Sequence, residues 1–259
     1  MIIFEIIFFF TLSVFSIYTF AGLGQLILDQ DEKNFFESFF FGFIVVTFII
    51  TLLHFFIKIN LYAILFVFLV GSYYSIKNFT LTINDYKKNF IYFVIFLVFV
   101  PIYLSQKYHE DFGYYHLPYV INLFNEKIIF GLANVNSAFI HNSIWLNLIA
   151  LFNLKNNFNF LTFPSFLFFI FFIIFSLKNI FINKTHKVSN YFLIVSLFYL
   201  ILKFTRISEF GTDLPATLFS LLTIFYFLRY FEITQAKIKL SYFYLILSFS
   251  IFSILIKFS

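Results

Sequence analysis

Apolar runs recur along the whole chain and restrict its fold more than any other feature. They are rich in Phe, Ile, Leu and Val, and the mean hydropathy is +0.95 over 259 residues. A backbone that faces lipid must satisfy its own hydrogen bonds, and a helix does so within one segment. The runs therefore exclude a soluble globular domain and predict an all-α, multi-pass transmembrane protein.

About eight of the runs are expected to be membrane-spanning helices, although several fall short of the roughly 20 residues usual for a crossing. Flanking Lys and Tyr side chains can reach the interface and cover the deficit. Glu5 stands where a cleavable signal peptide has basic residues, so the first run is expected to be an uncleaved span. The predicted spans are Ile2–Phe20, Phe36–Ile57, Leu61–Ser75, Phe90–Ser105, Leu161–Leu177, Tyr191–Phe204, Leu214–Tyr230 and Tyr242–Phe258.

Basic residues in three loops set the expected orientation, because the positive-inside rule places all three loops on the cytoplasmic side. This requires that a ninth apolar stretch, Ile144–Phe152, does not cross, and we expect it to form a helix at the outer interface. Residues 106–160 then form a long external loop, and residues 205–213 form a short one. The three basic loops contain Lys77, Lys87 and Lys88, then Lys178, Lys184 and Lys187, then Arg229, Lys237 and Lys239.

Ionisable groups concentrate in the long loop at residues 108–118, YHEDFGYYHLP, although only 11% of the chain is charged. His109 and His116 flank the adjacent carboxylates of Glu110 and Asp111. Such a cluster at the mouth of membrane helices costs stability, so it is a candidate functional site. Carboxylates in a partly dry pocket can supply a base near neutral pH, and with histidine they also suit a divalent cation such as Mg or Mn.

The alternative interpretation of the same residues is an interfacial belt. Its members, which would lie at headgroup level beside solvated acids, are Tyr108, Tyr114, Tyr115 and His116. Composition and spacing alone do not separate this belt from a functional site.

A short helix is predicted directly after the acidic cluster. Pro118 suits the first turn of a helix, and Leu117, Val120, Ile121 and Phe124 follow with helical spacing. We expect an amphipathic helix on the membrane surface, which would hold the cluster at headgroup depth.

The short external loop carries a second charged group. Arg206 could clamp a phosphate with two hydrogen bonds, while Glu209 and Asp213 could complete a carboxylate site with Asp111. Asp213 also lies two residues before Pro215, so an N-cap role is an equally good interpretation of that residue.

A third polar group places several side-chain amides near the single tryptophan. Such a group could bind a sugar, but an interfacial helix is the favoured interpretation because tryptophan prefers that depth. Its members are Asn134, Asn136, His141, Asn142, Trp145 and Asn147.

Three sequence strings together resemble the GT-C superfamily of polytopic membrane glycosyltransferases. They are EDFGYYHLP, SIWLNLIALFN and RISEFGTDLPATLFSLLTIFYFLR, and they give an acidic loop, interfacial helices, two spans and a second acidic loop. This superfamily includes protein O-mannosyltransferases, aminoarabinose transferases of lipid A and the catalytic subunit of oligosaccharyltransferase. The resemblance covers about residues 90–231.

The resemblance implies an inverting enzyme that transfers a sugar from a polyprenyl-phosphate donor to a hydroxyl of a glycan, lipid or protein acceptor. It places the reaction on the periplasmic face of a bacterial inner membrane. Asp111 matches the catalytic or metal-binding acid, Glu110 matches its acidic partner, and Asp213 matches the second-loop acid, also a possible metal ligand. Further substrate contacts are expected from Arg206, His116, Tyr115 and Glu209.

The chain also departs from the GT-C pattern. Three predicted spans precede residue 90, where the resemblance begins, so we expect extra N-terminal helices in residues 1–89 and a GT-C-like core in residues 90–259. Family members are usually longer, so we expect this chain to be an N-terminal fragment. Two other classes remain open, a transporter or flippase for a lipid-linked or anionic substrate and a non-catalytic membrane subunit.

Composition narrows the chemistry further. The chain contains no cysteine, which excludes disulfides, thiolate metal sites and a cysteine nucleophile. The net charge of +5 is spread over the loops, so it indicates membrane topology rather than nucleic-acid binding.

Overall fold

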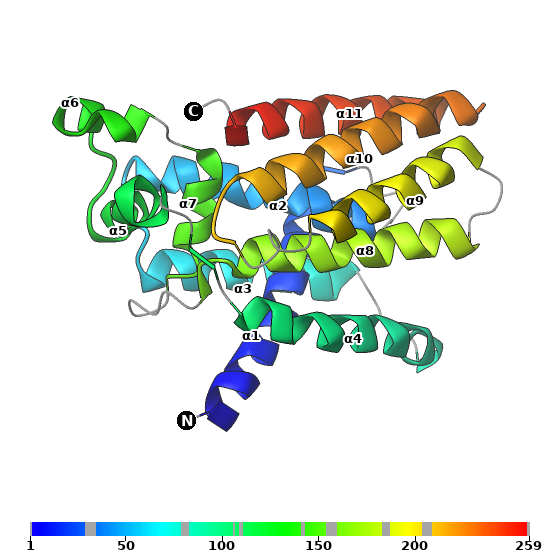
Figure 1. Cartoon of the computed structure of the whole chain (residues 1–259), viewed down its shortest axis with the longest axis horizontal. Coiled ribbons are helices and arrows are strands. Elements are labelled where there is room, and N and C mark those ends of the chain that lie inside the picture. The colour runs from blue at the N-terminus through cyan, green and yellow to red at the C-terminus, as the bar shows by residue number, and fades with distance from the viewer. Residues whose placement is uncertain are drawn as a thin grey trace.

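The computed structural model describes residues 2–28, 35–78, 83–105, 107–108, 111–140, 143–153, 160–182, 187–203 and 209–257. In these ranges the chain is helical, apart from turns, loops and one isolated β-bridge (Figure 1). The structure is therefore all-α over its described residues, as the apolar runs predict.

Five of the described helices are long and apolar enough to cross a membrane. They are α1 (Ile2–Gln25), α2 (Phe35–His54), α8 (Phe163–Ile182), α10 (Asp213–Glu232) and α11 (Ala236–Lys257). Three more apolar helices are α3 (Leu61–Asn78), α4 (Ile83–Leu104) and α9 (Lys187–Leu202). Each predicted span falls on one of these helices, because a long run of apolar side chains leaves the backbone no better way to satisfy its hydrogen bonds in lipid.

Most of the long helices run side by side and alternate in direction (Figure 1). Helices α2, α4, α9 and α11 end, and α8 and α10 begin, at the left-hand end of the bundle in Figure 1. We call this end the site face and the other end the opposite face. Because the helices alternate, the described parts of residues 105–153 and residues 209–213 both lie at the site face.

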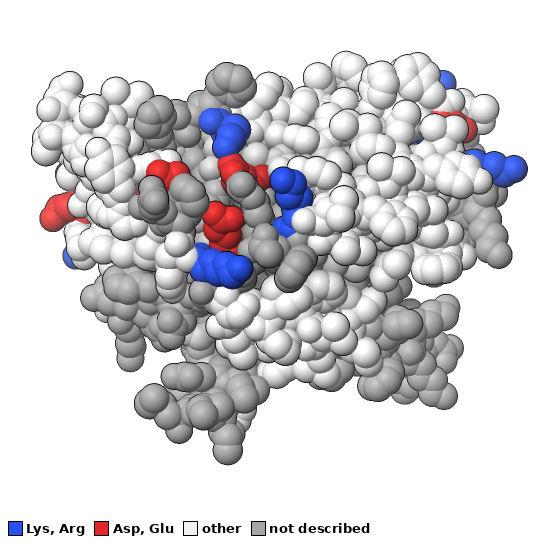
Figure 2. Space-filling model, viewed as in Figure 1, with Lys and Arg blue, Asp and Glu red and all other residues white. Residues whose placement is uncertain are grey.

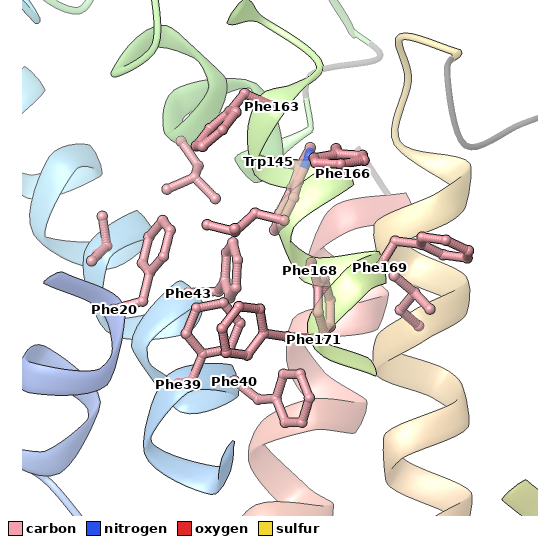
Figure 3. Packing of buried hydrophobic residues seen from close by; sticks show 14 of the residues in the cluster. Phe20, Phe39, Phe40, Phe43, Trp145, Phe163, Phe166, Phe168, Phe169 and Phe171 are labelled. Atoms are coloured by element: carbon pink, nitrogen blue, oxygen red, sulfur yellow. The ribbon is translucent and has the colours of Figure 1, made fainter. Parts of the chain in front are cut away.

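Aromatic rings fill the centre of the bundle (Figure 3). Phe43 of α2 stacks on Trp145 with ring centroids 5.6 Å apart and on Phe168 of α8 at 5.0 Å. Phe39 stacks on Phe171 at 3.9 Å. Lipid is as apolar as these rings, so they stabilise the bundle by close van der Waals packing, which anchors α8 against α2.

Helices α1, α2 and α3 pack closely through glycine. A methyl group at Gly42 would lie 1.8 Å from the carbonyl oxygen of Phe20, and one at Gly22 would lie 2.0 Å from that of Gly71. No side chain fits in these gaps, so the backbones approach closely, as small residues allow in membrane helix pairs.

The ninth apolar stretch forms α7 (Ile144–Ala150), which runs across the long helices in Figure 1. Its seven residues span only about 10 Å, too short for a crossing. We expected this helix to lie at the lipid interface, but all its residues after Ile144 are buried inside the protein. Ser143 caps it by accepting from the Trp145 amide at 3.3 Å and donates to the Ile256 carbonyl at 2.7 Å, which fixes α7 to the end of α11.

The long external loop contains further short helices. A π-helical turn, η1 (Phe112–His116), continues directly into α5 (Leu117–Asn125), with Pro118 in the first turn as predicted. Val120 and Leu123 of α5 are buried, so much of its apolar stripe packs against protein rather than lipid. The loop continues through α6 (Leu132–Val135) and the 3-10 helix η2 (Ser137–Ile140).

Candidate functional site

A short backbone pairing joins the two external loops. Lys107, just after α4, forms an isolated parallel β-bridge with Glu209, just before α10. The Phe210 amide donates to the Lys107 carbonyl at 3.2 Å. This pairing brings together two segments that are about 100 residues apart in the sequence.

Phe210 is the apolar anchor of this junction and is only 2% exposed. Its ring packs edge-on against Phe112 at 4.8 Å and lies 5.7 Å from the ring of His116. The ring of Tyr108 packs against that of Phe112, with centroids 4.4 Å apart. The aromatic contacts fix the position of η1 relative to the start of α10, and thus of Asp111 relative to Asp213.

Asp111 and Asp213 line one cavity of about 220 Å³. Acidic and basic side chains gather at this part of the site face, while most of the surrounding surface in the same view is uncharged (Figure 2). The lining residues are Asp111, Tyr115, His116, Glu209, Phe210, Gly211, Thr212, Asp213, Leu214 and Lys257. Five predicted site residues therefore meet in one place, namely Asp111, Tyr115, His116, Glu209 and Asp213.

The π-helical turn presents Tyr115 and His116 to this cavity. Burial raises the pKa of the Tyr115 phenol above its ordinary value, and the negative charges of Asp111 and Asp213 raise it further. Tyr115 therefore stays protonated at neutral pH and can donate a hydrogen bond. Single π-helical turns are frequent at functional sites because the extra residue redirects side chains.

Lys257, which sequence analysis did not identify as a site residue, lies in the last turn of α11 and pairs with the Asp213 carboxylate. The side chains are 60% and 47% exposed, so the pair itself contributes at most about 1 kcal/mol to stability. Asp213 is the first residue of α10 and follows the capping position, Thr212, so the N-cap interpretation is wrong. A lysine in the last turn of an apolar helix was the only sequence signal for Lys257.

A larger groove of about 720 Å³ adjoins the polar cavity and shares Asp213, Leu214 and Lys257 with it. Residues of α9, α10 and α11 line it together with Lys203, and although half of the lining residues are polar or charged, most of the lining surface is apolar. The remaining lining residues are Tyr199, Leu200, Lys203, Ala216, Thr217, Ser220, Leu221, Ser253 and Ile254. The site thus combines a charged end with an apolar extension between helices.

Glu110 and Arg206, both predicted site residues, lie outside the described residues, as does His109. In the third polar group of the sequence, the described side chains of Trp145 and Asn147 are engaged inside the bundle and not in one sugar site. Trp145 is fully buried and donates from Nε1 to Ser165 Oγ at 3.1 Å, while Asn147 donates to Thr51 Oγ1 at 2.9 Å. His141 and Asn142 of that group are not described.

The described part of the chain contains no group of three or more His, Asp or Glu side chains placed to hold a metal ion. Asp111, Glu209 and Asp213 line the cavity without forming such a set, and Asp213 faces Lys257. The described donors thus do not fit a divalent cation by themselves, and the predicted cation stays a prediction.

These features define an all-helical, membrane-embedded protein with a charged cavity at one end of its helices. The chain belongs to a family described as a domain of unknown function, DUF8201, whose family model matches residues 1–259. No curated protein and no solved structure matches the chain.

Proposed function

We propose that this protein is an inverting membrane glycosyltransferase of the GT-C type that uses a polyprenyl-phosphate sugar donor. The observation that carries the proposal is the convergence of Asp111 and Asp213 on one cavity beside an apolar groove. A non-catalytic subunit with a headgroup-level belt would not need its two loop acids in the same cavity.

The proposed reaction is a single displacement at the anomeric carbon. Asp111 accepts the proton of the acceptor hydroxyl as its oxygen bonds to the anomeric carbon, and the bond from that carbon to the phosphate oxygen breaks. The electron pair of this bond leaves with the polyprenyl phosphate. Tyr115, as a protonated phenol, donates a hydrogen bond to the acceptor or the sugar. His116 and Glu209 are further substrate contacts, and Glu110 orients the base.

The departing phosphate requires cationic partners because its charge grows in the transition state. Lys257 is the described cation that lines the cavity, and its ammonium group already neutralises Asp213. In our proposal Lys257 shifts from Asp213 to the phosphate, with Arg206 as the second clamp. A divalent cation would supply additional charge neutralisation, but neither the proton transfer to Asp111 nor the displacement depends on one.

The groove between α9 and the α10–α11 pair offers the polyprenyl chain an apolar path that ends at the phosphate position. Tyr199 and Ile254, which line it, are about half exposed, Tyr199 on the apolar helix α9 and Ile254 on the candidate span α11. A lipid could therefore enter sideways from the bilayer, with its phosphate at Lys257 and its sugar in the polar cavity.

The proposed membrane arrangement has eight spans, α1 to α4 and α8 to α11, with the loop helices at the outer interface. The site face then lies on the periplasmic side of a bacterial inner membrane. Residues 1–89 would be extra N-terminal helices, and residues 90–259 the GT-C-like core. This assignment follows the basic loops at the opposite face.

Binding of undecaprenyl phosphate to the purified chain in nanodiscs tests the lipid part of the proposal. We expect saturable binding and about a tenfold weaker affinity in Lys257→Met, since a charge-assisted contact to phosphate is lost. Lys203→Met is the matched control, because Lys203 lines the same groove away from the cavity. Equal binding by wild type and Lys257→Met would contradict the phosphate assignment.

A further inference from the structure

A second part of the site face exposes large apolar side chains. Phe130 is 81% exposed and Val135 is 83% exposed, and Ile129 and Ile140 are also exposed. These residues belong to residues 128–140, which include α6 and η2 and project beyond the ends of the long helices at the left of Figure 1. We call this segment the apolar projection.

The apolar projection is built into the fold rather than loosely attached. The Ile128 amide donates to the His54 carbonyl at 3.1 Å, and His54 Nε2 donates to the Glu126 carbonyl at 3.0 Å. Ala138 and Phe139 are buried, and Phe139 packs 6.2 Å from Tyr119 of α5. The segment is thus anchored at both ends, while the apolar side chains between face outward.

The sequence of the projection carries no charge, and its polar side chains are those of Asn134, Asn136 and Ser137. Residues 128–140 contain no Asp, Glu, Lys or Arg, although Glu126 and Lys127 directly precede them. The exposed surface also continues onto the end of α2, where Phe55 lies 6.4 Å from Phe130 and Phe56 is 80% exposed. A candidate membrane span thus extends its outward apolar surface directly into the projection.

We infer that the apolar projection inserts into the lipid leaflet at the site face, with Phe130 and Val135 at the boundary between headgroups and acyl chains. Continuity with the outer surface of α2 and the lack of charge select lipid over an aqueous or protein partner. We predicted that α5 contacts the membrane interface. Much of its apolar stripe packs against protein instead, so in this inference the neighbouring apolar projection makes the contact with lipid.

Tryptophan fluorescence in nanodiscs with brominated phosphatidylcholine tests this inference. Trp145 is the single tryptophan and is fully buried, so it gives a baseline that reports folding. Phe130→Trp adds a probe at the tip of the projection. We expect blue-shifted emission and about a twofold loss of the added fluorescence, greater with bromine near the headgroup end of the acyl chain than near its terminal end.

Two matched variants calibrate the measurement. Ile251→Trp places the probe on the exposed side of α11, where bromine deep in the acyl chains should quench it. Asn125→Trp places it at the exposed end of α5, before the projection, where little quenching is expected.

Unquenched, red-shifted emission from Phe130→Trp would show a water-exposed segment and overturn the inference. Unquenched but blue-shifted emission would show a protein partner or a second copy on this surface and would also overturn it. Val135→Trp repeats the test at a second position, so a local defect of one variant does not decide the result.

Discussion

The two ends of the helical bundle both carry charged side chains, but they use them differently. At the site face, Asp111, Glu209, Asp213 and Lys257 surround a cavity and are partly exposed. At the opposite face, Arg229 is only 6% exposed inside α10. The site face therefore leaves these charges accessible to a ligand, whereas the opposite face encloses Arg229.

Contacts at the opposite face explain this enclosure. Glu232 accepts hydrogen bonds from the Val188 amide at 2.8 Å and from Ser189 Oγ at 2.6 Å, so a carboxylate of α10 caps the start of α9. Arg229 donates to the same Ser189 hydroxyl at 3.2 Å. These groups satisfy one another between two helices, which is the arrangement expected of a structural network.

Burial of a charge therefore does not mark function by itself in this protein. The buried charges at the opposite face have protein partners that hold two helices together. The charges at the site face converge from two separate loops around a space that a substrate can enter. Mutations should therefore separate stability at one end from activity at the other.

The largest expected effect is on activity at the site face. Asp111→Asn should lower sugar transfer about 10²–10⁴-fold, the usual contribution of a general base. Its thermal stability should change by less than about 0.5 kcal/mol, because Asp111 is partly exposed. The measurement is release of polyprenyl phosphate from a panel of polyprenyl-phosphate sugars in nanodiscs.

Glu126→Gln is the control for Asp111→Asn, since Glu126 is an exposed acid on the same face that lines neither the cavity nor the groove. It should transfer sugar like the wild type. Full activity in Asp111→Asn would eliminate Asp111 as the base while leaving the lipid-binding test unaffected.

The next largest effect is on stability at the opposite face. Arg229→Met should destabilise the folded chain by about 1–3 kcal/mol, because the buried Ser189 hydroxyl loses its charge-assisted hydrogen bond from Arg229. Thermal unfolding in nanodiscs measures this loss, and Lys187→Met, a change of an exposed lysine on the same face, should leave the melting temperature unchanged. An Arg229→Met protein that melts normally but no longer binds undecaprenyl phosphate would reverse the comparison between the two ends.

The junction of the two loops should show an intermediate effect. Phe210→Ala removes the ring that lies between Phe112 and His116, so the two acids lose their relative position. We expect about a 10²-fold loss of transfer, typical of a small displacement of catalytic groups. Phe210→Leu keeps most of the buried volume and should retain more activity.

Spin labels on the two loops report the displacement directly. The chain lacks cysteine, and a Cβ added at Gly113 or Gly211 would meet nothing within 4 Å, so both positions can accept a label. Dipolar broadening between labels at Gly113→Cys and Gly211→Cys should weaken in Phe210→Ala. Unchanged broadening together with lost activity would show that Phe210 does not position the loops.

Sequence reasoning located the helices well because apolar runs leave few alternatives in lipid. It also selected Asp111, Tyr115, His116, Glu209 and Asp213, which the structure brings to one cavity. It did not predict the β-bridge at Lys107 or the anchor at Phe210, since one phenylalanine among 49 carries no distinguishing signal. Lys257 was missed for a related reason, because its role depends on the pairing of α11 with α10.

The burial of α7 could not be predicted from the sequence either. Polar residues around Trp145 suit a membrane interface, and only the three-dimensional structure shows that Ser165 and Thr51 accept their hydrogen bonds inside the bundle. The boundary proposed at residue 89 and the number of spans stay predictions, because both depend on the membrane rather than on the packing of this chain alone.

The smallest expected effect concerns the pKa of Tyr115. Since its pKa is raised in the folded protein, the folded state keeps a proton that the unfolded chain releases above about pH 10. The free energy of unfolding should then fall with rising pH above that point, whereas below it Tyr115 should add no pH dependence.

Tyr115→Phe should lose less stability than the wild type in melts between about pH 9 and pH 11, where tyrosine ionises. Tyr114→Phe, at the exposed neighbouring ring, should follow the wild type.

Combining variants identifies the source of this alkaline effect. Burial is the largest cause, and the charges of Asp111 and Asp213 add to it, so Asp111→Asn should reduce the difference between Tyr115 and Phe at that position without abolishing it. An unchanged difference would mean that Asp111 is too far away to influence the phenol. The acid and Tyr115 would then lie in the same cavity without acting on the same substrate atoms, and the site face would resemble the opposite face more than we propose.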